Sequence, residues 1–140
     1  MLTLRLARAH VQQMIEQATA GAPEEICGLI AGEQDGEAVT IIPLRNRASQ
    51  PQQQFDADPI DLLRALRELE DAGQQIVAHY HSHPTSPPIP SQLDIARARQ
   101  HHPDLIQLII SLQHNEPEMA AWQITPASVE RVELEITHGL

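Results

Sequence analysis

The stretch Ala78-His79-Tyr80-His81-Ser82-His83-Pro84 organises this chain of 140 residues. We interpret Ile76 to His83 as a strand, which ends at Pro84 because proline cannot donate a hydrogen bond to a neighbouring strand. Side chains two residues apart on a strand point the same way, so His81 and His83 project from one face with Cβ atoms roughly 6 to 7 Å apart. Two imidazoles at that spacing can converge on one metal ion.

A carboxylate follows at a spacing that suits the same site. Three prolines stiffen the loop from 85 to 90, and Ser91 is a favourable helix N-cap, which places Asp94 in the first helical turn. Taken alone, Ser91 and Asp94 form an ordinary capping box. Together with the two histidines, Asp94 completes an open three-ligand site. Zinc in catalytic sites commonly has three protein ligands and a water in the fourth position.

Water activation at such a site also needs a base that is not itself a ligand. Glu24 and Glu25 open an apolar strand expected over 25–31, and an acidic residue at the edge of such a strand is costly unless it is paired or functional. Glu25 is the better candidate because it alternates with Cys27 and Leu29 on one face. The residues alone leave Glu24 open as the alternative.

The other elements are expected from apolar periodicity and turn residues. Further strands are expected at 2–6, 39–44, 105–112, 119–124 and from Val129 to Ile136; helices at 7–20, 59–71 and 91–100; a hairpin turn at 34–37; and a polar surface loop at 45–58. Asp58 and Gly73 are expected to cap the helix at 59–71. Its residues Ile60, Leu63, Leu66 and Leu69 and their neighbours are expected to face inward. Because antiparallel hairpins mix with separate helices, the fold class is α/β in the loose sense, nearer α+β.

Composition limits the classes of function. The length favours one domain over 1–140, and the aromatic share of 2% means that aliphatic side chains and alanine must build the core. The net charge of −10 argues against nucleic acid and anionic membranes as partners, because phosphate binding needs clustered basic residues. We find no transmembrane segment and no signal peptide, and the single cysteine excludes an internal disulfide. We therefore expect a cytoplasmic protein.

These residues resemble a known family. Glu25, then His81-Ser82-His83-Pro84, Ser91 and Asp94 look like the signature of the JAMM metalloproteases, or MPN-plus domains. Residues 23–32 resemble the family's first motif, in which Glu precedes x-Cys-Gly. Asn46 and the stretch 55–59 are similar to the small prokaryotic members, so the resemblance covers almost all of the chain.

The resemblance implies a site and a reaction. His81, His83 and Asp94 would bind one Zn²⁺ per chain, Glu25 would act as general acid and base on the zinc-bound water, and Ser91 would hydrogen-bond the developing oxyanion or the water. The implied fold is a mixed sheet with flanking helices, similar to that of cytidine deaminases. The implied reaction is hydrolysis of the peptide or isopeptide bond that follows the C-terminus of a ubiquitin-like protein.

Small prokaryotic relatives are associated with sulfur-carrier proteins of the ThiS and MoaD type, which end in Gly-Gly, and we favour that substrate class. The alternatives are a non-catalytic MPN-type binding module, a metal-dependent amidase on a small substrate, or a role in DNA repair, against which the acidic charge counts. The oligomeric state is left open. His79 shares the face of His81 and is expected to pack, Cys27 is expected in the core, and His101-His102 receives no metal role.

Overall fold

The computed structural model describes residues 2–33 and 37–138. The strands are β1 (Thr3–Ala7), β2 (Cys27–Gly32), β3 (Ala38–Leu44), β4 (Gln75–His83), β5 (Ile106–Ser111), β6 (Glu118–Ile124) and β7 (Val129–Thr137), and the helices are α1 (Arg8–Gly21), α2 (Pro59–Ala72) and α3 (Gln92–His101). Every expected strand and helix is present, with shifts of a few residues at the ends. Most of the expected hairpin turn, at 34–36, lies outside the described residues.

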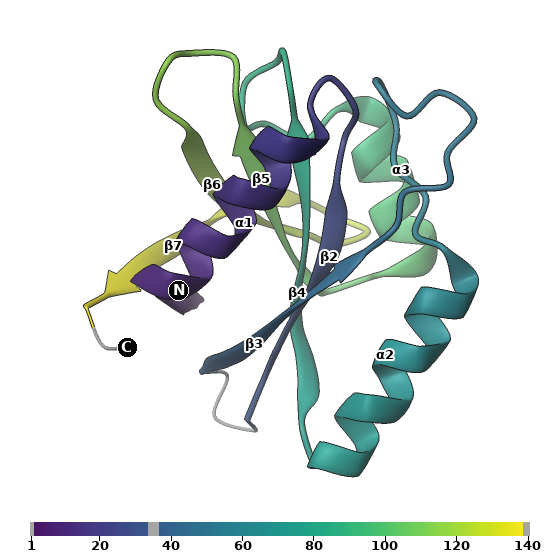
Figure 1. Cartoon of the computed structure of the whole chain (residues 1–140), viewed down its shortest axis with the longest axis vertical. Helices are drawn as coiled ribbons and strands as arrows, with labels where there is room; N and C mark the ends of the chain where they lie inside the picture. The colour runs from purple at the N-terminus through teal and green to yellow at the C-terminus, as the bar shows by residue number, and fades with distance from the viewer. Residues whose placement is uncertain (1, 34–36, 139–140) are drawn as a thin grey trace.

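The strands form one mixed sheet in the order β1-β7-β6-β5-β4-β2-β3. β4 lies inside this sheet, antiparallel to β2 and parallel to β5. Figure 1 shows α1 against the sheet and α2 and α3 to the other side of β4. The predicted α+β class, with a mixed central sheet and flanking helices, is therefore confirmed.

Alternation along β4 divides its side chains between two cores. Ala78 and Tyr80 join the larger apolar cluster, which includes Met14 and Ala18 of α1. The smaller cluster lies on the opposite face, around Leu29 and Ala65 of α2. The histidines of β4 occupy the alternate positions, so they face α2 and α3 rather than α1. This arrangement places the candidate ligands His81 and His83 on one side of the sheet.

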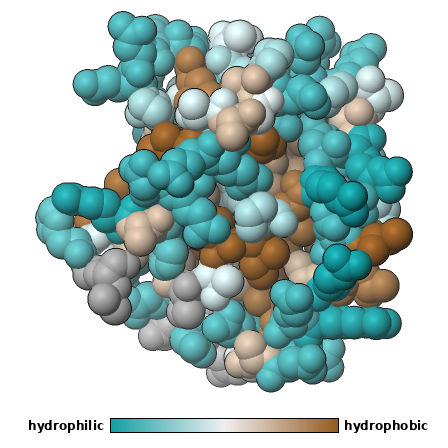
Figure 2. Space-filling model, in the orientation of Figure 1, coloured by the Kyte–Doolittle hydropathy of each residue, from teal (hydrophilic) through white to brown (hydrophobic). Residues whose placement is uncertain are grey.

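The inward face predicted for α2 is wrong at three of its four residues. Ile60, Leu63 and Leu66 are 59%, 52% and 40% exposed, whereas Leu69 is buried as expected and Ala65 is buried beside it. The apolar residues of α2 form two neighbouring stripes along the helix. The stripe of Ala65 and Leu69 packs towards the sheet, because the small side chain of Ala65 allows a close approach. Figure 2 shows hydrophobic atoms at the surface on the α2 side of the molecule.

Both predicted caps of α2 are confirmed. The Asp58 carboxylate accepts from the backbone N–H groups of Ile60 and Asp61, and Gly73 ends the helix with a left-handed φ of 69°. Among the described residues, no helix combines the length and the apolar character that crossing a membrane requires.

Gly28 allows β2 to lie close to the Tyr80 ring. A Cβ at this position would lie 2.3 Å from the Tyr80 hydroxyl, and Tyr80 is only 1% exposed. We predict that Gly28→Ala lowers the free energy of unfolding by about 1–3 kcal/mol, the usual range for overpacking, as measured by urea denaturation. In a Tyr80→Leu background the same substitution should cost much less. An equal cost in both backgrounds would rule out the clash with Tyr80 as its cause.

Candidate metal centre

Three side chains converge where β4 ends and α3 begins. The Nε2 atoms of His81 and His83 lie 3.1 Å apart, and Asp94 Oδ2 lies 3.2 Å from the first and 3.0 Å from the second. These three form the one group of metal-binding type found among the described residues. His81 and His83 are buried, and the Asp94 side chain is only 12% exposed. The structure thus brings together the three residues that the sequence singled out.

The spacing of these atoms fits a zinc ion. Ligand atoms about 2.0–2.1 Å from a tetrahedral zinc stand about 3.3 Å from one another, and the observed separations of 3.0 to 3.2 Å come close to that value. A purely hydrogen-bonded cluster satisfies the same atoms less well, because one Oδ2 would serve two imidazoles whose Nε2 atoms also face each other. The donor set of two imidazoles and one carboxylate is one that zinc accepts.

The surrounding backbone orients two of the ligands. The His83 ring contacts the Pro87 carbonyl oxygen through Nδ1 at 2.8 Å. Since a carbonyl only accepts, Nδ1 must carry the proton, which leaves the lone pair on Nε2 to face the cluster. Asp94 Oδ2 accepts from the Ser91 backbone N–H at 2.9 Å. The loop of residues 84–91 therefore fixes both the tautomer of His83 and the position of the carboxylate.

The protonation states of His81 and Asp94 suit metal binding. Burial lowers the pKa of His81, although Asp94 opposes the shift, so its imidazole favours the neutral form. Burial alone would raise the pKa of Asp94, but its hydrogen bonds with His81 and His83 hold it below the ordinary value. A neutral imidazole and an ionised carboxylate are the forms in which these side chains bind a metal. Burial would lower the pKa of His83, but its hydrogen bonds with Asp94 and Pro87 raise it, so a metal competes with a proton at that imidazole.

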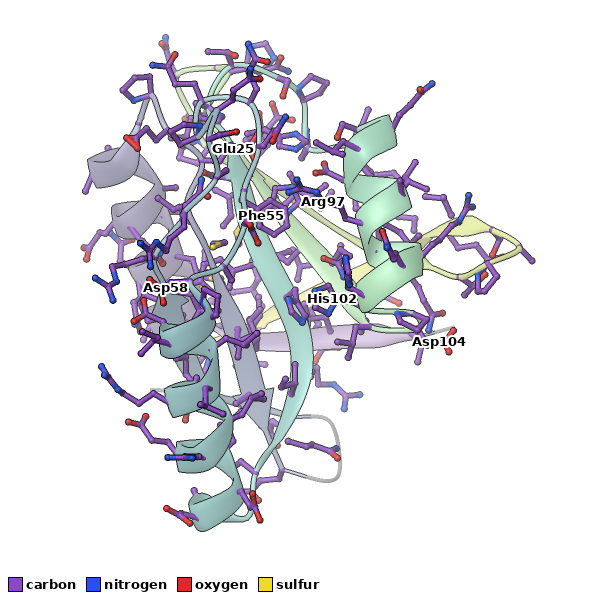
Figure 3. All side chains as sticks on the ribbon, turned by 90° about the vertical axis from the view of Figure 1, so that its right-hand side faces the viewer. Glu25, Phe55, Asp58, Arg97, His102 and Asp104 are labelled. Atoms are coloured by element: carbon purple, nitrogen blue, oxygen red, sulfur yellow. The ribbon has the colours of Figure 1, made fainter. Side chains whose placement is uncertain are left out.

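Glu25 lies immediately before β2 and is only 6% exposed. Burial raises the pKa of its carboxyl from 4.5 to about 7, while the charge of His83 opposes this shift. Its Oε1 atom is buried with no hydrogen-bond partner among the described residues. Figure 3 shows Glu25 above Phe55 and Arg97, in the upper part of the view. The carboxyl therefore combines burial, nearby charges and an unpaired oxygen, which makes Glu25 a candidate general base.

Ser82 ties β4 to the residue after Glu25. Its backbone N–H donates to the Ile26 carbonyl at 3.0 Å, and its hydroxyl accepts from the Ile26 N–H at 2.9 Å. Ser82 lies between the two histidines of the candidate metal centre, so this double link fixes the position of Glu25 relative to them. The middle residue of His-Ser-His thus has a positioning role that its sequence position did not reveal.

Ser91 is the N-cap of α3, as predicted. Its hydroxyl oxygen accepts from the Asp94 backbone N–H at 3.0 Å, while Asp94 accepts from the Ser91 N–H, which completes a capping box. Because the hydroxyl acts here as an acceptor, its own proton remains available to donate. Ser91 is exposed.

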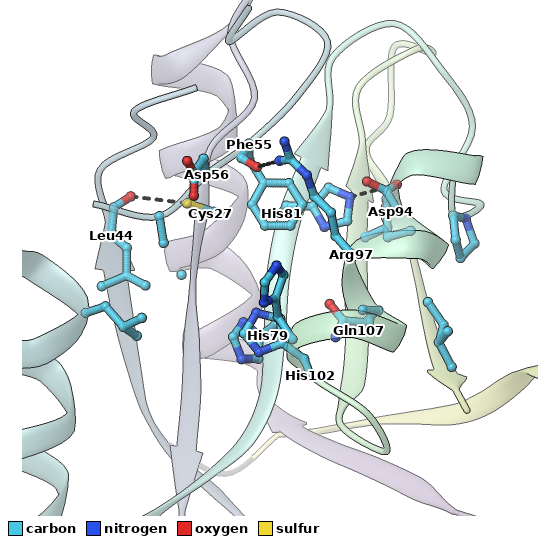
Figure 4. Close-up of a pocket in the computed structure, with 18 of the residues that line it drawn as sticks. Cys27, Leu44, Phe55, Asp56, His79, His81, Asp94, Arg97, His102 and Gln107 are labelled. Atoms are coloured by element: carbon cyan, nitrogen blue, oxygen red, sulfur yellow. Dashed lines mark hydrogen bonds and ion pairs between the residues drawn. The ribbon is translucent and has the colours of Figure 1, made fainter. Parts of the chain in front are cut away.

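The polar loop of residues 45–58 covers part of the site. The Phe55 ring stacks on His81 with 4.4 Å between ring centroids, and its carbonyl accepts a hydrogen bond from Arg97 of α3. Figure 4 shows Phe55 over His81, with Arg97 reaching it from α3. Sequence reasoning missed Arg97. Its position three residues after Asp94, on the same side of a helix, was the available signal.

Asn46 holds this loop in shape. Its Nδ2 donates to the carbonyl oxygens of Glu25 and Gln54, both at 2.9 Å. Its Oδ1 accepts from the backbone N–H groups of Ala48 at 3.0 Å and Asp56 at 2.9 Å. All four hydrogen-bonding positions of this amide are used. Asn46 therefore joins the backbone of the candidate base to both ends of the loop that carries Phe55.

Comparison with known proteins gives one family match and several relatives. A family model described as prokaryotic homologs of the JAB domain matches residues 7–125. The desampylase of Haloferax volcanii is 39% identical over 97 residues, 69% of this chain and 68% of the relative. The "Probable TtuB-protein conjugate cleaving protease" of Thermus thermophilus is 40% identical over 105 residues, 75% and 70% of the two chains. The CysO-cysteine peptidase of Mycobacterium tuberculosis is 28% identical over 121 residues, which are 85% of this chain and 81% of the relative.

Solved structures agree with the fold. A protein from Desulfitobacterium hafniense superposes with a TM-score of 0.88 at 30% identity, over 100% of this chain and 95% of the other. A structure described as JAMM, a metalloprotease-like zinc site in the proteasome and signalosome, superposes with a TM-score of 0.61 at 18% identity, over 98% and 99%. The second likeness concerns the fold alone.

The raised pKa of Glu25 predicts how the stability of the metal-free protein depends on pH. Between about pH 4.5 and 7 the folded state holds a proton on Glu25 that the unfolded chain releases, so this group stabilises the fold at pH 5 and loses that contribution as the pH rises through about 7. Relative to Glu25→Gln, wild type should therefore become less stable from pH 5 to pH 7.5 in urea denaturation after chelation. Glu24→Gln, an exposed neighbour, is the control. A constant difference between wild type and Glu25→Gln would contradict the shift.

Proposed function

The chain belongs to the family of prokaryotic homologues of the JAB domain, and on that premise we propose that it is a zinc-dependent peptidase acting after the C-terminal tail of a ubiquitin-like or sulfur-carrier protein. Peptidase activity follows from the family and from its named relatives. The proposal adds the metal, the residue roles and the substrate to that activity. The observation that carries it is the convergence of His81, His83 and Asp94 beside the buried carboxyl of Glu25.

The named relatives support the substrate class. One is named for cleaving TtuB-protein conjugates and another for removing cysteine from CysO. We propose that this chain likewise recognises a carrier tail ending in Gly-Gly, of the ThiS or MoaD type, and hydrolyses the bond that follows it. We also propose that residues 1–140 act as one catalytic domain and that the protein works in the cytoplasm. The family match over residues 7–125 supports the first of these two proposals.

We propose that His81, His83 and Asp94 hold one zinc ion per chain. Zinc bound there supplies a Lewis acid for the water and for the substrate carbonyl. Phe55 and the loop that Asn46 anchors cover one side of His81, which reduces access of bulk water to that side. A site partly closed to water strengthens the electrostatic interactions within it.

Glu25 is the proposed general acid and base. Its free Oε1 accepts a proton as water attacks the carbonyl carbon of the last tail residue. The same carboxyl then delivers that proton to the leaving amine as the C–N bond breaks. A pKa near 7 suits both halves of this cycle, because the group is readily ionised and readily protonated at neutral pH.

Ser91 is proposed to stabilise the oxyanion that forms during attack. Its hydroxyl oxygen is fixed by the Asp94 N–H at 3.0 Å, so the hydroxyl proton is presented from a rigid helix start. A non-catalytic binding module would not require this set of residues, and the presence of the whole set favours the enzyme. A metal-dependent amidase on a small substrate remains the second candidate, because the same residues serve both reactions.

The proposal predicts a separation of metal binding from hydrolysis. Glu25→Gln should retain zinc by elemental analysis, because Glu25 is not a ligand. Its cleavage of a ThiS-type carrier extended by one alanine after Gly-Gly should fall at least about a hundredfold, the usual loss for a missing general base. Glu24→Gln, which changes the exposed neighbour, should keep wild-type turnover. Full turnover by Glu25→Gln would show that the base has been assigned wrongly.

A further inference from the structure

A cavity of about 430 Å³ begins at the ligands His81 and Asp94 and extends between the sheet and helices α2 and α3 (Figure 4). Its volume is many times the roughly 30 Å³ that one water molecule occupies in the liquid. It lies at the small end of the range for ligand pockets, roughly 300–1,000 Å³. The proposed hydrolysis involves only the end of the cavity formed by His81 and Asp94. The rest of the cavity has no assigned function.

The floor of the cavity is polar and buried. His79 of β4 and Gln107 of β5 are partners in the parallel register, so their side chains lie next to each other. They are only 8% and 4% exposed. The His102 ring, which follows α3, packs against the His79 ring with 4.0 Å between centroids and a tilt of 39° between the ring planes. Figure 4 shows His79 and His102 together below His81, with Gln107 beside them.

Gln107 lacks a partner for its amide. Its Nε2 atom is buried and makes no hydrogen bond among the described residues. An unsatisfied buried amide destabilises a protein, because the group loses its hydrogen bonds to water without a replacement. The fold could avoid this cost with an aliphatic side chain, as Ile109 provides at the next position on the same face of β5. The amide therefore points to a polar group that enters from the cavity.

The walls limit what that group can be. Leu62 of α2, Ala98 of α3 and Ile124 of β6 line the cavity around the polar floor. A matching ligand has an apolar body that contacts these walls and one hydrogen-bonding group that reaches Gln107 and His79. Because the cavity starts at His81 and Asp94, an amino-acid side chain next to the cleaved bond can enter it.

The proposed function, on which this inference rests, decides which side chain it is. A tail that ends in Gly-Gly carries no side chain next to the cleaved bond on its own side. Only the released residue can place a side chain there. We propose that this cavity binds the side chain of the released residue, and that Gln107 with His79 selects an uncharged side chain bearing a hydroxyl or amide group.

Threonine and valine give a matched pair of probes, since they have nearly the same shape and differ in one hydroxyl. With zinc-loaded protein and the peptides acetyl-Ala-Ala-Gly-Gly-Thr and acetyl-Ala-Ala-Gly-Gly-Val, we expect kcat/KM to favour threonine by about tenfold, which corresponds to one buried hydrogen bond. The difference should appear mainly in KM, because the contact is made away from the reacting atoms.

Gln107→Met removes the amide while keeping an apolar side chain of similar length. It should reduce the preference for threonine to about twofold or less and should leave the melting temperature equal or higher, since an unpaired amide is lost. Gln123→Met is the matched control, because Gln123 lies on β6 outside this cavity and its amide already donates to the Asp104 carbonyl. It should keep the full preference.

Either of two results in the cleavage assay would contradict the proposal. If wild type cleaves both peptides equally well, or Gln107→Met keeps the preference, the cavity holds water only, while the proposed function stands. If neither peptide is cleaved, the alanine-extended ThiS-type carrier decides the proposed function, which fails if that carrier is not cleaved either. The cavity is then judged by calorimetric binding of the two peptides to zinc-loaded Glu25→Gln: tighter binding of threonine that Gln107→Met abolishes supports the cavity, and equal binding refutes it.

Discussion

The structure depends on the pairing of β4 between β2 and β5. This pairing sets Cys27 opposite His81 and Ile109 beside it, which fixes the side of the sheet to which each β4 residue points. Because side chains alternate along a strand, a register shift of one residue would send the histidines into the α1 core and Tyr80 towards α2 and α3. The two hydrogen bonds between Ser82 and Ile26 secure this register next to Glu25. The geometry of the candidate metal centre is therefore a consequence of strand register at the middle of the sheet.

Burial explains the shifted pKa values of the side chains that this register brings together. The same exclusion of water raises the pKa of Glu25 to about 7 and favours neutral His81. Three buried side-chain atoms lack hydrogen-bond partners among the described residues: Glu25 Oε1, His81 Nδ1 and Gln107 Nε2. All three belong to the metal centre or to the cavity beside it. Natural proteins leave polar groups unsatisfied mainly where they function, so this distribution marks one continuous functional region.

The sequence predicted the features that short-range rules determine. His81, His83 and Asp94 were found from the period of a strand and the cap of a helix, and Asp58 and Gly73 were identified as caps by their own chemistry. The inward face of α2 was wrong because two apolar stripes compete for the sheet and only tertiary packing selects Ala65 and Leu69 over Ile60 and Leu63. The stacking of Phe55 on His81 and the hydrogen bonds of Asn46 connect segments that lie far apart in the chain, so no local pattern could predict them.

The central claim is that strand register and a helix cap together build a zinc site, and zinc content tests it most directly. Elemental analysis of untagged protein, for wild type and His83→Ala, should give about one zinc per chain in wild type and almost none in the variant. The variant must remain folded for the comparison to count, which its circular dichroism establishes. Wild-type protein that binds no zinc even after reconstitution would contradict the account, because His81, His83 and Asp94 would then be a hydrogen-bonded cluster without catalytic purpose.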